Sequence, residues 1–198
     1  MKLEMPVVET KRLLLRPVEW EDALDLFAIY HDPLVMLGNA VMSPMVDVEE
    51  MLEFMKATFL AYERWGLPQA MVLEELTTGC VIGICDYHTI TGTTGELGYL
   101  LAQRYWHQGY MKEAIAAMLY IGFVHTGLSC IEAEYDANNV ASKNVLHACG
   151  FGADKRQHTA ILLNDGKYHS LMKCCIKKAE YDKKIGGKED EERISTKI

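Results

Sequence analysis

The stretch Leu100-Leu101-Ala102-Gln103-Arg104-Tyr105-Trp106-His107-Gln108-Gly109-Tyr110-Met111-Lys112-Glu113-Ala114 decides the fold of this chain. It predicts the end of a strand, a turn and the start of a helix. Apolar residues recur at helical spacing after Gly109, so the N–H groups from Trp106 to Met111 precede the helical hydrogen-bond ladder. Unpaired N–H groups at the positive end of a helix dipole favour a phosphate. We therefore interpret this turn as an anion-binding cradle; an ordinary strand-to-helix turn is the alternative.

Two residues within the stretch support the cradle. Gly109 has no side chain, which lets the main chain approach a ligand closely. Arg104 adds a forked cation to the same turn, and a guanidinium can bind a phosphate through two parallel hydrogen bonds.

The cradle lies between two predicted parallel strands. One strand ends with Glu96 to Leu101 and places Glu96, Gly98 and Leu100 on the same face. The other strand, Ser129 to Asp136, alternates apolar residues with Glu132, Glu134 and Asp136, which gives it an acidic face. A strand, a crossover helix and a second strand form a right-handed unit in which the two strands are parallel.

The segments before this unit read as one strand, two helices and a hairpin. Residues 10–17 form a short apolar strand that ends at Pro17, and the stripe Trp20, Leu24, Phe27 and Ala28 predicts the buried face of a helix. Residues 33–46 read as an irregular loop, and Asp47 with Glu50 predicts the start of the second helix. Residues 69–76 and 80–88 form the hairpin.

The segments after it read as a helix, a second hairpin and a tail. The helix begins near Asn139 and stops at Gly150, and the hairpin turns at residues 164–166. The last residues are densely charged and predict a partly helical, then disordered, end. We expect one domain over residues 1–178 followed by a charged C-terminal tail over residues 179–198.

Composition narrows the class of function. The length of 198 residues and the hydrophobic content of 49% fit one soluble globular domain. Lys and Arg number 20 and Asp and Glu number 28, so the formal net charge is −8, which argues against nucleic acid and suits a cationic amine. The six cysteines lack metal-site spacing, and no apolar window is long enough for a membrane span. We expect a cytoplasmic protein without metal, nucleic-acid or membrane partners.

Three ordered motifs resemble the GCN5-related N-acetyltransferase (GNAT) superfamily, and in particular its ribosomal-protein N-terminal acetyltransferases. Thr10 to Arg16 is similar to the opening strand of that subgroup, and Arg104 to Ala114 is similar to the loop that binds the acetyl-CoA pyrophosphate. The second cofactor motif of the family is similar to Asn139-Val140-Ala141-Ser142, with Val145-Leu146 and Gly150-Phe151. The resemblance covers roughly residues 8–178.

The resemblance implies an α/β (α+β) fold with a mixed central sheet of about seven strands and flanking helices. Its parallel strand pair would splay apart at the cofactor site. The chain departs from the family at the loop, where glycine is usual at the fourth and sixth positions. Here His107 takes the fourth position and Gly109 the sixth, and Met111 replaces a small residue. These changes keep the backbone N–H donors in place.

The resemblance also implies the reaction, which is transfer of an acetyl group from acetyl-CoA to a primary amine by direct attack, with no acyl-enzyme. The subgroup implies a protein N-terminal α-amine as the acceptor. A small amine, such as a polyamine or an aminoglycoside, is the enzymatic alternative. A non-catalytic acyl-CoA sensor of the same fold is the alternative from another class. Monomers and homodimers are both common in the family.

The catalytic candidates follow from the same resemblance. Glu96 is the first candidate for the general base because family members often place a carboxylate on this strand, and Glu134 on the neighbouring strand is the second. His88 is a weaker candidate. Ser142 would donate a proton to the leaving thiolate. The carboxylates could instead be solvated surface groups, and Ser142 could serve helix capping and packing.

The expected contacts with acetyl-CoA complete the candidate site. The family polarises the thioester with a backbone N–H on the strand before the cradle, which here lies near Leu100 or Leu101. Asn139 would hold the pantetheine arm or cap the helix, and Ser142 belongs to this set as well. The expected cradle contacts are Arg104, Trp106, His107, Gln108, Gly109, Tyr110 and Met111.

Overall fold

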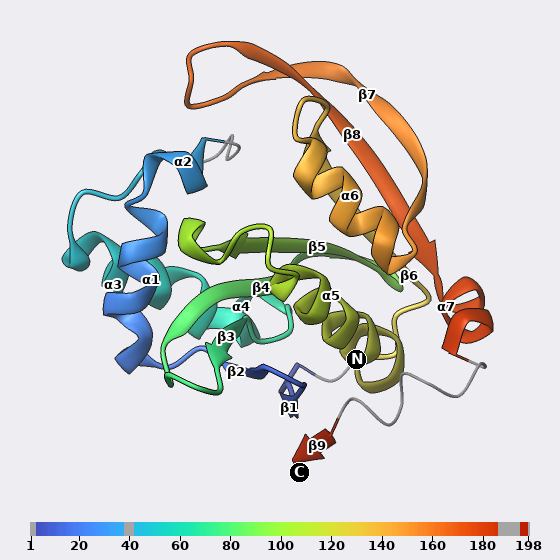
Figure 1. Cartoon of the computed structure of the whole chain (residues 1–198), viewed down its shortest axis with the longest axis horizontal. Coiled ribbons are helices and arrows are strands. Elements are labelled where there is room, and N and C mark those ends of the chain that lie inside the picture. Colours follow the sequence, from blue (N-terminus) through green and yellow to red (C-terminus); the bar gives the residue numbers. More distant parts are fainter. Residues whose placement is uncertain (1–2, 38–41, 186–194, 198) are drawn as a thin grey trace.

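The computed structural model describes residues 3–37, 42–185 and 195–197 (Figure 1). Its strands form one nine-stranded sheet in the order β7-β8-β6-β5-β4-β3-β2-β1-β9. Within the described ranges β5 and β6 are parallel and the other neighbours are antiparallel. The strands are β1 Val7–Glu9, β2 Leu13–Pro17, β3 Met71–Glu75, β4 Val81–Thr91, β5 Thr94–Leu101, β6 Cys130–Asp136, β7 Gly152–Leu162, β8 Tyr168–Lys177 and β9 Ser195–Lys197.

The mixed α/β fold and the parallel pair are confirmed. The sheet exceeds the expected seven strands because the three-residue strands β1 and β9 extend one edge. Short strands lack the apolar alternation that would reveal them in the sequence, since three residues show barely one period of the pleat.

Helices cover both faces of the sheet, and each face has its own core. The helices are α1 Ala23–Tyr30, α2 Pro33–Met36, α3 Val48–Ala57, α4 Tyr62–Trp65, α5 Tyr110–Tyr120, α6 Val140–Cys149 and α7 Lys178–Ile185. Alternation along β3 divides the two cores. Met71 and Leu73 pack in the core that contains α5, whereas Val72 packs in the core that contains α1 and α3.

The first helix buries a different face from the one that the sequence predicts. Trp20 and Leu24 are 49% and 68% exposed, so the predicted stripe is wrong. The buried residues of α1 are Ala23, Leu26, Ile29 and Tyr30. The 3₁₀ turn Trp20–Asp22 precedes α1, and its tighter winding breaks the phase of a single continuous helix. The sequence pattern assumed that continuous helix.

The remaining predicted elements are largely confirmed. Asp47 caps α3 by accepting a hydrogen bond from the Glu50 N–H at 2.9 Å. Both predicted hairpins form, as β3 with β4 and as β7 with β8. The segment 33–46, expected as a loop, begins with the short helix α2, and its residues 38–41 lie outside the described part of the chain.

The predicted tail begins with helix α7. Tyr181 of α7 is 7% exposed, and its ring lies 4.9 Å from that of Phe123. Ser195–Lys197 pairs with β1, whereas residues 186–194 and 198, for which disorder was expected, lie outside the described ranges. No helix in the described part of the chain is both long and apolar enough to cross a membrane.

Candidate active site

The central feature of the site is a fork between β5 and β6. The two strands pair over three positions, which end at Glu96 opposite Glu132. Beyond this point β5 continues along β4 to Leu101, and β6 continues along β8 to Asp136. The facing edges of β5 and β6 therefore separate, which confirms the expected splayed pair.

Backbone alternation decides which N–H groups point into the fork. The Ala102 N–H donates to the Ile82 carbonyl of β4 at 2.9 Å, so Leu100, two residues earlier, also directs its N–H toward β4. Tyr99 and Leu101 direct theirs to the opposite side. The Leu101 carbonyl points to the same side as the Leu101 N–H, and it accepts a hydrogen bond from Trp106 Nε1 at 2.7 Å. Of the two predicted donor positions, Leu101 faces the fork and Leu100 faces β4.

The predicted cradle follows directly from the end of β5. A 3₁₀ turn over Gln103–Tyr105 leads into an exposed loop, and α5 begins at Tyr110. The Glu113 N–H donates to the Gly109 carbonyl at 3.2 Å, which places the N–H groups of Tyr110 and Met111 ahead of the helical ladder. Gln103 and Arg104 of the turn are exposed, and so are the loop residues Trp106, His107, Gln108 and Gly109.

Two residues of the loop have left-handed backbone conformations. His107 has a φ of 59° and Gly109 a φ of 82°. A side chain at Gly109 would meet Arg12 Nη2 at 3.5 Å, which is ordinary contact, so Gly109 is required by its dihedral angle. The fourth position of the loop, where the family usually has glycine, also needs this conformation, and His107 adopts it with a side chain.

The cradle is supported from behind by Arg12, Glu75 and Glu113, whose supporting role the sequence analysis did not predict. Arg12 of the β1–β2 turn donates to the Gln108 carbonyl at 2.9 Å and bonds to Glu113 at 2.8 Å. Its guanidinium also lies 4.1 Å from the centre of the Tyr110 ring. Tyr110 donates to Glu75 at 2.5 Å, and the side chains of both Tyr110 and Met111 are buried. These two residues therefore present only their backbone to the cradle.

The start of α6 lies on the face of the sheet to which the Tyr99 side chain of β5 points, and it is linked to that strand. Asn139 Oδ1 accepts a hydrogen bond from the Ser142 N–H at 2.9 Å, which makes Asn139 the helix cap. Ser142 Oγ lies 2.6 Å from the hydroxyl of Tyr99. Burial raises the pKa of Tyr99, so its hydroxyl keeps its proton at neutral pH. Tyr99 is a site residue that the sequence analysis did not single out.

The opposite face of the fork contains the two predicted carboxylates and a lysine between them. Lys173 Nζ on β8 lies 3.1 Å from Glu96 Oε2 and 3.1 Å from Glu134 Oε1. It also lies 3.3 Å from Glu132 Oε2. The structure thus brings Glu96 and Glu134 together around one cation. We call Glu96, Glu132, Glu134 and Lys173 the fork cluster.

His88 joins the fork cluster from β4. Tyr87 pairs with Leu97 and Thr89 with Glu96, so His88 is an extra residue in a β-bulge. Its Nε2 lies 3.4 Å from Glu96 Oε1 and its Nδ1 lies 3.5 Å from Asp86. The hydrogen bonds to Asp86 and Glu96 raise the pKa of His88 to about 10. His88, followed by Lys173, holds the pKa of Glu96 below its ordinary value.

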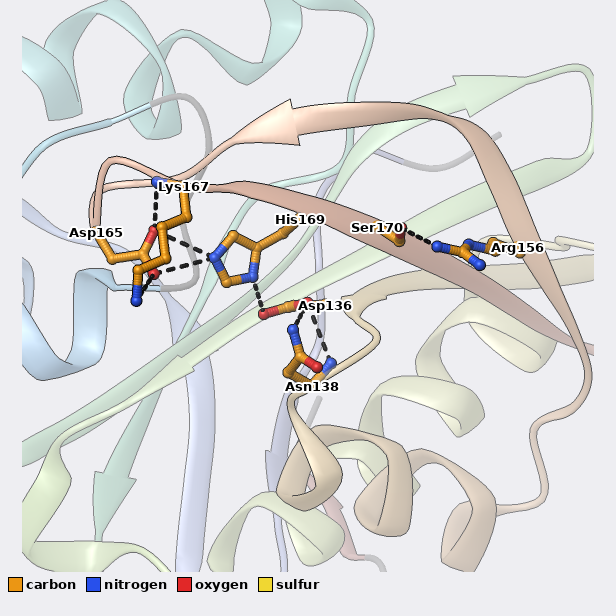
Figure 2. A network of polar contacts seen from close by, with 7 residues as sticks. All are labelled: Asp136, Asn138, Arg156, Asp165, Lys167, His169 and Ser170. Carbon is orange, nitrogen blue, oxygen red and sulfur yellow. Dashed lines mark hydrogen bonds and ion pairs between the residues drawn. The ribbon is translucent and has the colours of Figure 1, made fainter.

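The β7–β8 hairpin forms an arm that reaches from α6 toward α2 (Figure 1). Asn164 at its tip donates to the carbonyls of Met36 and Met42, each at 2.7 Å. Figure 2 shows the second attachment, in which His169 lies between two carboxylates. Its Nδ1 is 2.7 Å from Asp136 Oδ2 and its Nε2 is 3.1 Å from Asp165. These contacts fix the arm over the end of β6.

The site thus combines a parallel fork, an N–H cradle and the capped helix α6. The acetyltransferase (GNAT) domain model matches residues 12–152. The chain belongs to this GNAT acetyltransferase family.

Several known proteins are similar to the chain. The uncharacterized N-acetyltransferase p20 of Bacillus licheniformis is 30% identical over 150 residues, covering 74% of this chain and 83% of that protein. The ribosomal-protein-S5-alanine acetyltransferase of Vibrio fischeri has a TM-score of 0.72 and 21% identity, covering 85% of this chain and 94% of that one. The spermidine N-acetyltransferase of Vibrio cholerae, in complex with CoA and spermine, has a TM-score of 0.75 and 18% identity, covering 85% and 97%.

Proposed function

We propose that this chain is an N-acetyltransferase that moves an acetyl group from acetyl-CoA to a primary amine by direct attack. One observation carries the proposal. The N–H groups of Tyr99 and Leu101 point into the fork, and the cradle begins at the end of the same strand. A single strand thus aligns donors for a thioester oxygen with donors for a pyrophosphate.

Each predicted donor residue has a role in this arrangement. The cradle residues Arg104 to Met111 would bind the pyrophosphate, with Arg104 adding a cation. The Leu101 N–H would stabilise the charge that develops on the thioester oxygen. Ser142, bonded to the Tyr99 hydroxyl at 2.6 Å, would donate a proton to the departing thiolate. Asn139 would present its amide nitrogen to the pantetheine arm while its oxygen caps α6.

Glu96 remains the first candidate for the group that receives the amine's proton, and Glu134 the second. Because bonds to His88 and Lys173 lower the pKa of Glu96, this carboxylate stays ionised and is a weak base. We infer that Glu96 acts through a water molecule, which passes the proton outward. Glu96→Gln should preserve acetyl-CoA affinity and lower kcat, whereas Glu134→Gln should have the smaller effect. Equal rates for Glu96→Gln and the parent would assign the step to Glu134 or to water alone.

A protein N-terminal α-amine is our first proposal for the acceptor. It is supported by the resemblance of residues 10–16 to the opening strand of that subgroup and by the likeness to a ribosomal-protein-S5-alanine acetyltransferase. We place the enzyme in the cytoplasm, as a monomer or a homodimer that needs no nucleic acid and no membrane.

A small polyamine is the second candidate, and a specific observation favours it. The same face of β6 presents Glu132, Glu134 and Asp136 in a row, and Glu96 lies beside them on β5. Such a row suits an acceptor with more than one positive charge. A spermidine N-acetyltransferase is among the similar structures.

The test is release of CoA from acetyl-CoA in the presence of a panel of amines. The panel contains peptides beginning with Ala, Ser or Met, polyamines and aminoglycosides. Turnover with the peptides alone supports the first acceptor, and turnover with polyamines alone supports the second. Tight binding of acetyl-CoA without release of CoA for any amine would indicate that the chain is an acyl-CoA sensor and not an enzyme. Failure to bind acetyl-CoA at all would refute the proposal.

A further inference from the structure

Lys173 occupies a position that the proposed mechanism does not yet use. It pairs in register with Glu134, whereas Glu96 faces Glu132 at the last pair before the fork. Its ammonium therefore links β5, β6 and β8 at the point where the sheet opens. The Lys173 side chain is 26% exposed, and those of Glu96, Glu132 and Glu134 are 20%, 33% and 29% exposed. This partial burial reduces screening by solvent and strengthens the three ion pairs.

Without this cation, His88 would still lie beside Glu96, but Glu132 and Glu134 would lose the ion pair that joins them to Glu96. Like charges in one site disfavour ionisation, and each carboxylate would move away from its neighbours. The cluster would then lose both its geometry and its charge. Lys173 is thus the cation that reaches both Glu96 and Glu134 across the fork.

We propose that Lys173 is a positioning residue that holds the carboxylates of Glu96 and Glu134 across the fork, where they face the incoming amine. The proposal rests on the proposed function only for the role of the amine. Its statement about the fork cluster concerns the free protein. Lys173 itself acts through the carboxylates and needs no contact with the substrate.

Other titratable groups face the cluster and enter the expected pH dependence. His88 and Asp86 approach Glu96 from β4. Burial opposes the charge of Lys173, but its bonds to Glu134 and Glu96 outweigh this and raise its pKa above the ordinary value. The lysine therefore stays charged over the pH range in which Glu96 titrates. Within the described residues, the other titratable groups on this face are Cys130, Glu132 and Asp136 of β6, Lys155 of β7, and His169, Cys175 and Lys177 of β8.

The direct experiment is an NMR titration of the Glu96 side-chain carboxyl in the free protein. We expect Glu96 in the parent to titrate below the range of an ordinary glutamate. Lys173→Met keeps the length of the side chain and removes its charge, so the pKa of Glu96 should rise. Lys173→Arg should restore the parent value. An unchanged pKa of Glu96 in Lys173→Met, or an ordinary value in the parent, would overturn the proposal.

Lys155→Met is the matched control. Lys155 lies opposite Lys173 on β7, is exposed, and loses the same charge on substitution. Because the ion pairs of the fork cluster are made by Lys173, this control variant should raise the pKa of Glu96 much less than Lys173→Met does. A rise as large as that of Lys173→Met would show a general charge effect in place of a positioning role. If Lys173→Met fails to fold, Lys173→Gln, which also removes the charge, takes its place, and an unchanged pKa of Glu96 in that variant would overturn the proposal.

Kinetics give an independent readout. The acid limb of the kcat/KM profile should move to higher pH in Lys173→Met, with a severalfold loss at about pH 6 and recovery at higher pH. Lys173→Arg should restore the parent profile. A uniform loss at every pH would indicate a merely structural role and contradict the proposal. If the parent turns over no amine, the proposed function fails, and the NMR titration still judges Lys173.

Discussion

Two residues with positive φ angles, His107 and Gly109, set the backbone conformation of the cradle. Gly109→Ala should cost about 1–2 kcal/mol of stability, because a left-handed residue with a side chain is strained. Acetyl-CoA affinity should fall as well, because the amides of the cradle lose their alignment. Calorimetric binding and denaturant unfolding measure the two effects.

Gly66→Ala is the control for Gly109→Ala. Gly66 has a φ of 62°, lies in open space and ends helix α4, where its N–H donates to the Glu63 carbonyl. It should lose a comparable amount of stability while acetyl-CoA affinity stays at the parent value. If Gly109→Ala kept the acetyl-CoA affinity of the parent, the cradle would not be part of the acetyl-CoA site.

The contact between Tyr99 and Ser142 predicts a coupled pair of substitutions. Tyr99→Phe and Ser142→Ala should each slow CoA release, since either one breaks the same hydrogen bond. The double variant should be no slower than the slower single variant, with a coupling energy of about 1 kcal/mol. A double-mutant cycle on kcat measures it. Strictly additive losses would mean that the hydroxyls act separately.

These residues show what the sequence could and could not reveal about the site. Asn139 and Ser142 stand within one helical turn, so their capping arrangement follows from local spacing. Tyr99 and Ser142 are 43 positions apart, and Lys173 and Glu96 are 77 apart. Contacts of that kind depend on the strand order of the sheet, which places β8 beside β6. No local pattern indicates them.

The arm is the element whose attachment should depend on pH. Hydrogen bonds to Asp165 and then Asp136 raise the pKa of His169. A raised pKa means that the attachment is fully present below the ordinary histidine pKa and is lost as pH rises through the raised value. Amide exchange at the arm tip, corrected for intrinsic rates, should therefore quicken above that pH.

His169→Gln should abolish this pH dependence, whereas His125→Gln should keep it. His125 bonds to the Glu4 carbonyl, far along the chain from the arm. Identical exchange profiles in His169→Gln and the parent would show that Asn164 alone holds the tip.

Helix α7 is the second element with a testable attachment. Tyr181→Ala should cost about 3 kcal/mol, because it removes a buried ring that packs against Phe123. Tyr168→Ala, at a tyrosine that is 77% exposed, should leave thermal stability unchanged. A parent-like melting temperature for Tyr181→Ala would mean that α7 contributes little. It would support a domain boundary at residue 178.

Elements were predicted well wherever their periodicity was long. The hairpins, the parallel pair and α5 follow from repeated alternation or helical spacing. The buried face of α1 did not, because Trp20 and Leu24 fit a helical stripe that the preceding 3₁₀ turn rotates away from the core. The spacing of apolar residues indicates which residues share one face of a helix, but packing against the core decides which face is buried.

At the scale of the whole molecule, the fork divides the sheet into two halves joined through three paired positions. Strands β1 to β5 and β9 lie on one side, and β6 to β8 lie on the other. Three kinds of contact cross this division. They are the ion pairs of the fork cluster, the Tyr99–Ser142 contact and the bonds from the arm tip to residues 36 and 42. The two halves are held together by side chains where the backbone ladder ends.

Because the hydrogen-bond ladder between β5 and β6 is interrupted, the free energy of unfolding should depend on the supply of acetyl-CoA. A molecule that binds in the fork takes the place of the missing hydrogen bonds between the two strands, so it binds the native state. It therefore adds RT ln(1 + [L]/Kd) to the free energy of unfolding, where [L] is its free concentration. That amounts to about 2.7 kcal/mol at a concentration near 100 Kd. The melting temperature should therefore climb with acetyl-CoA concentration, as differential scanning fluorimetry can show. In a cell that exhausts its acetyl-CoA, this chain would become a better substrate for proteases.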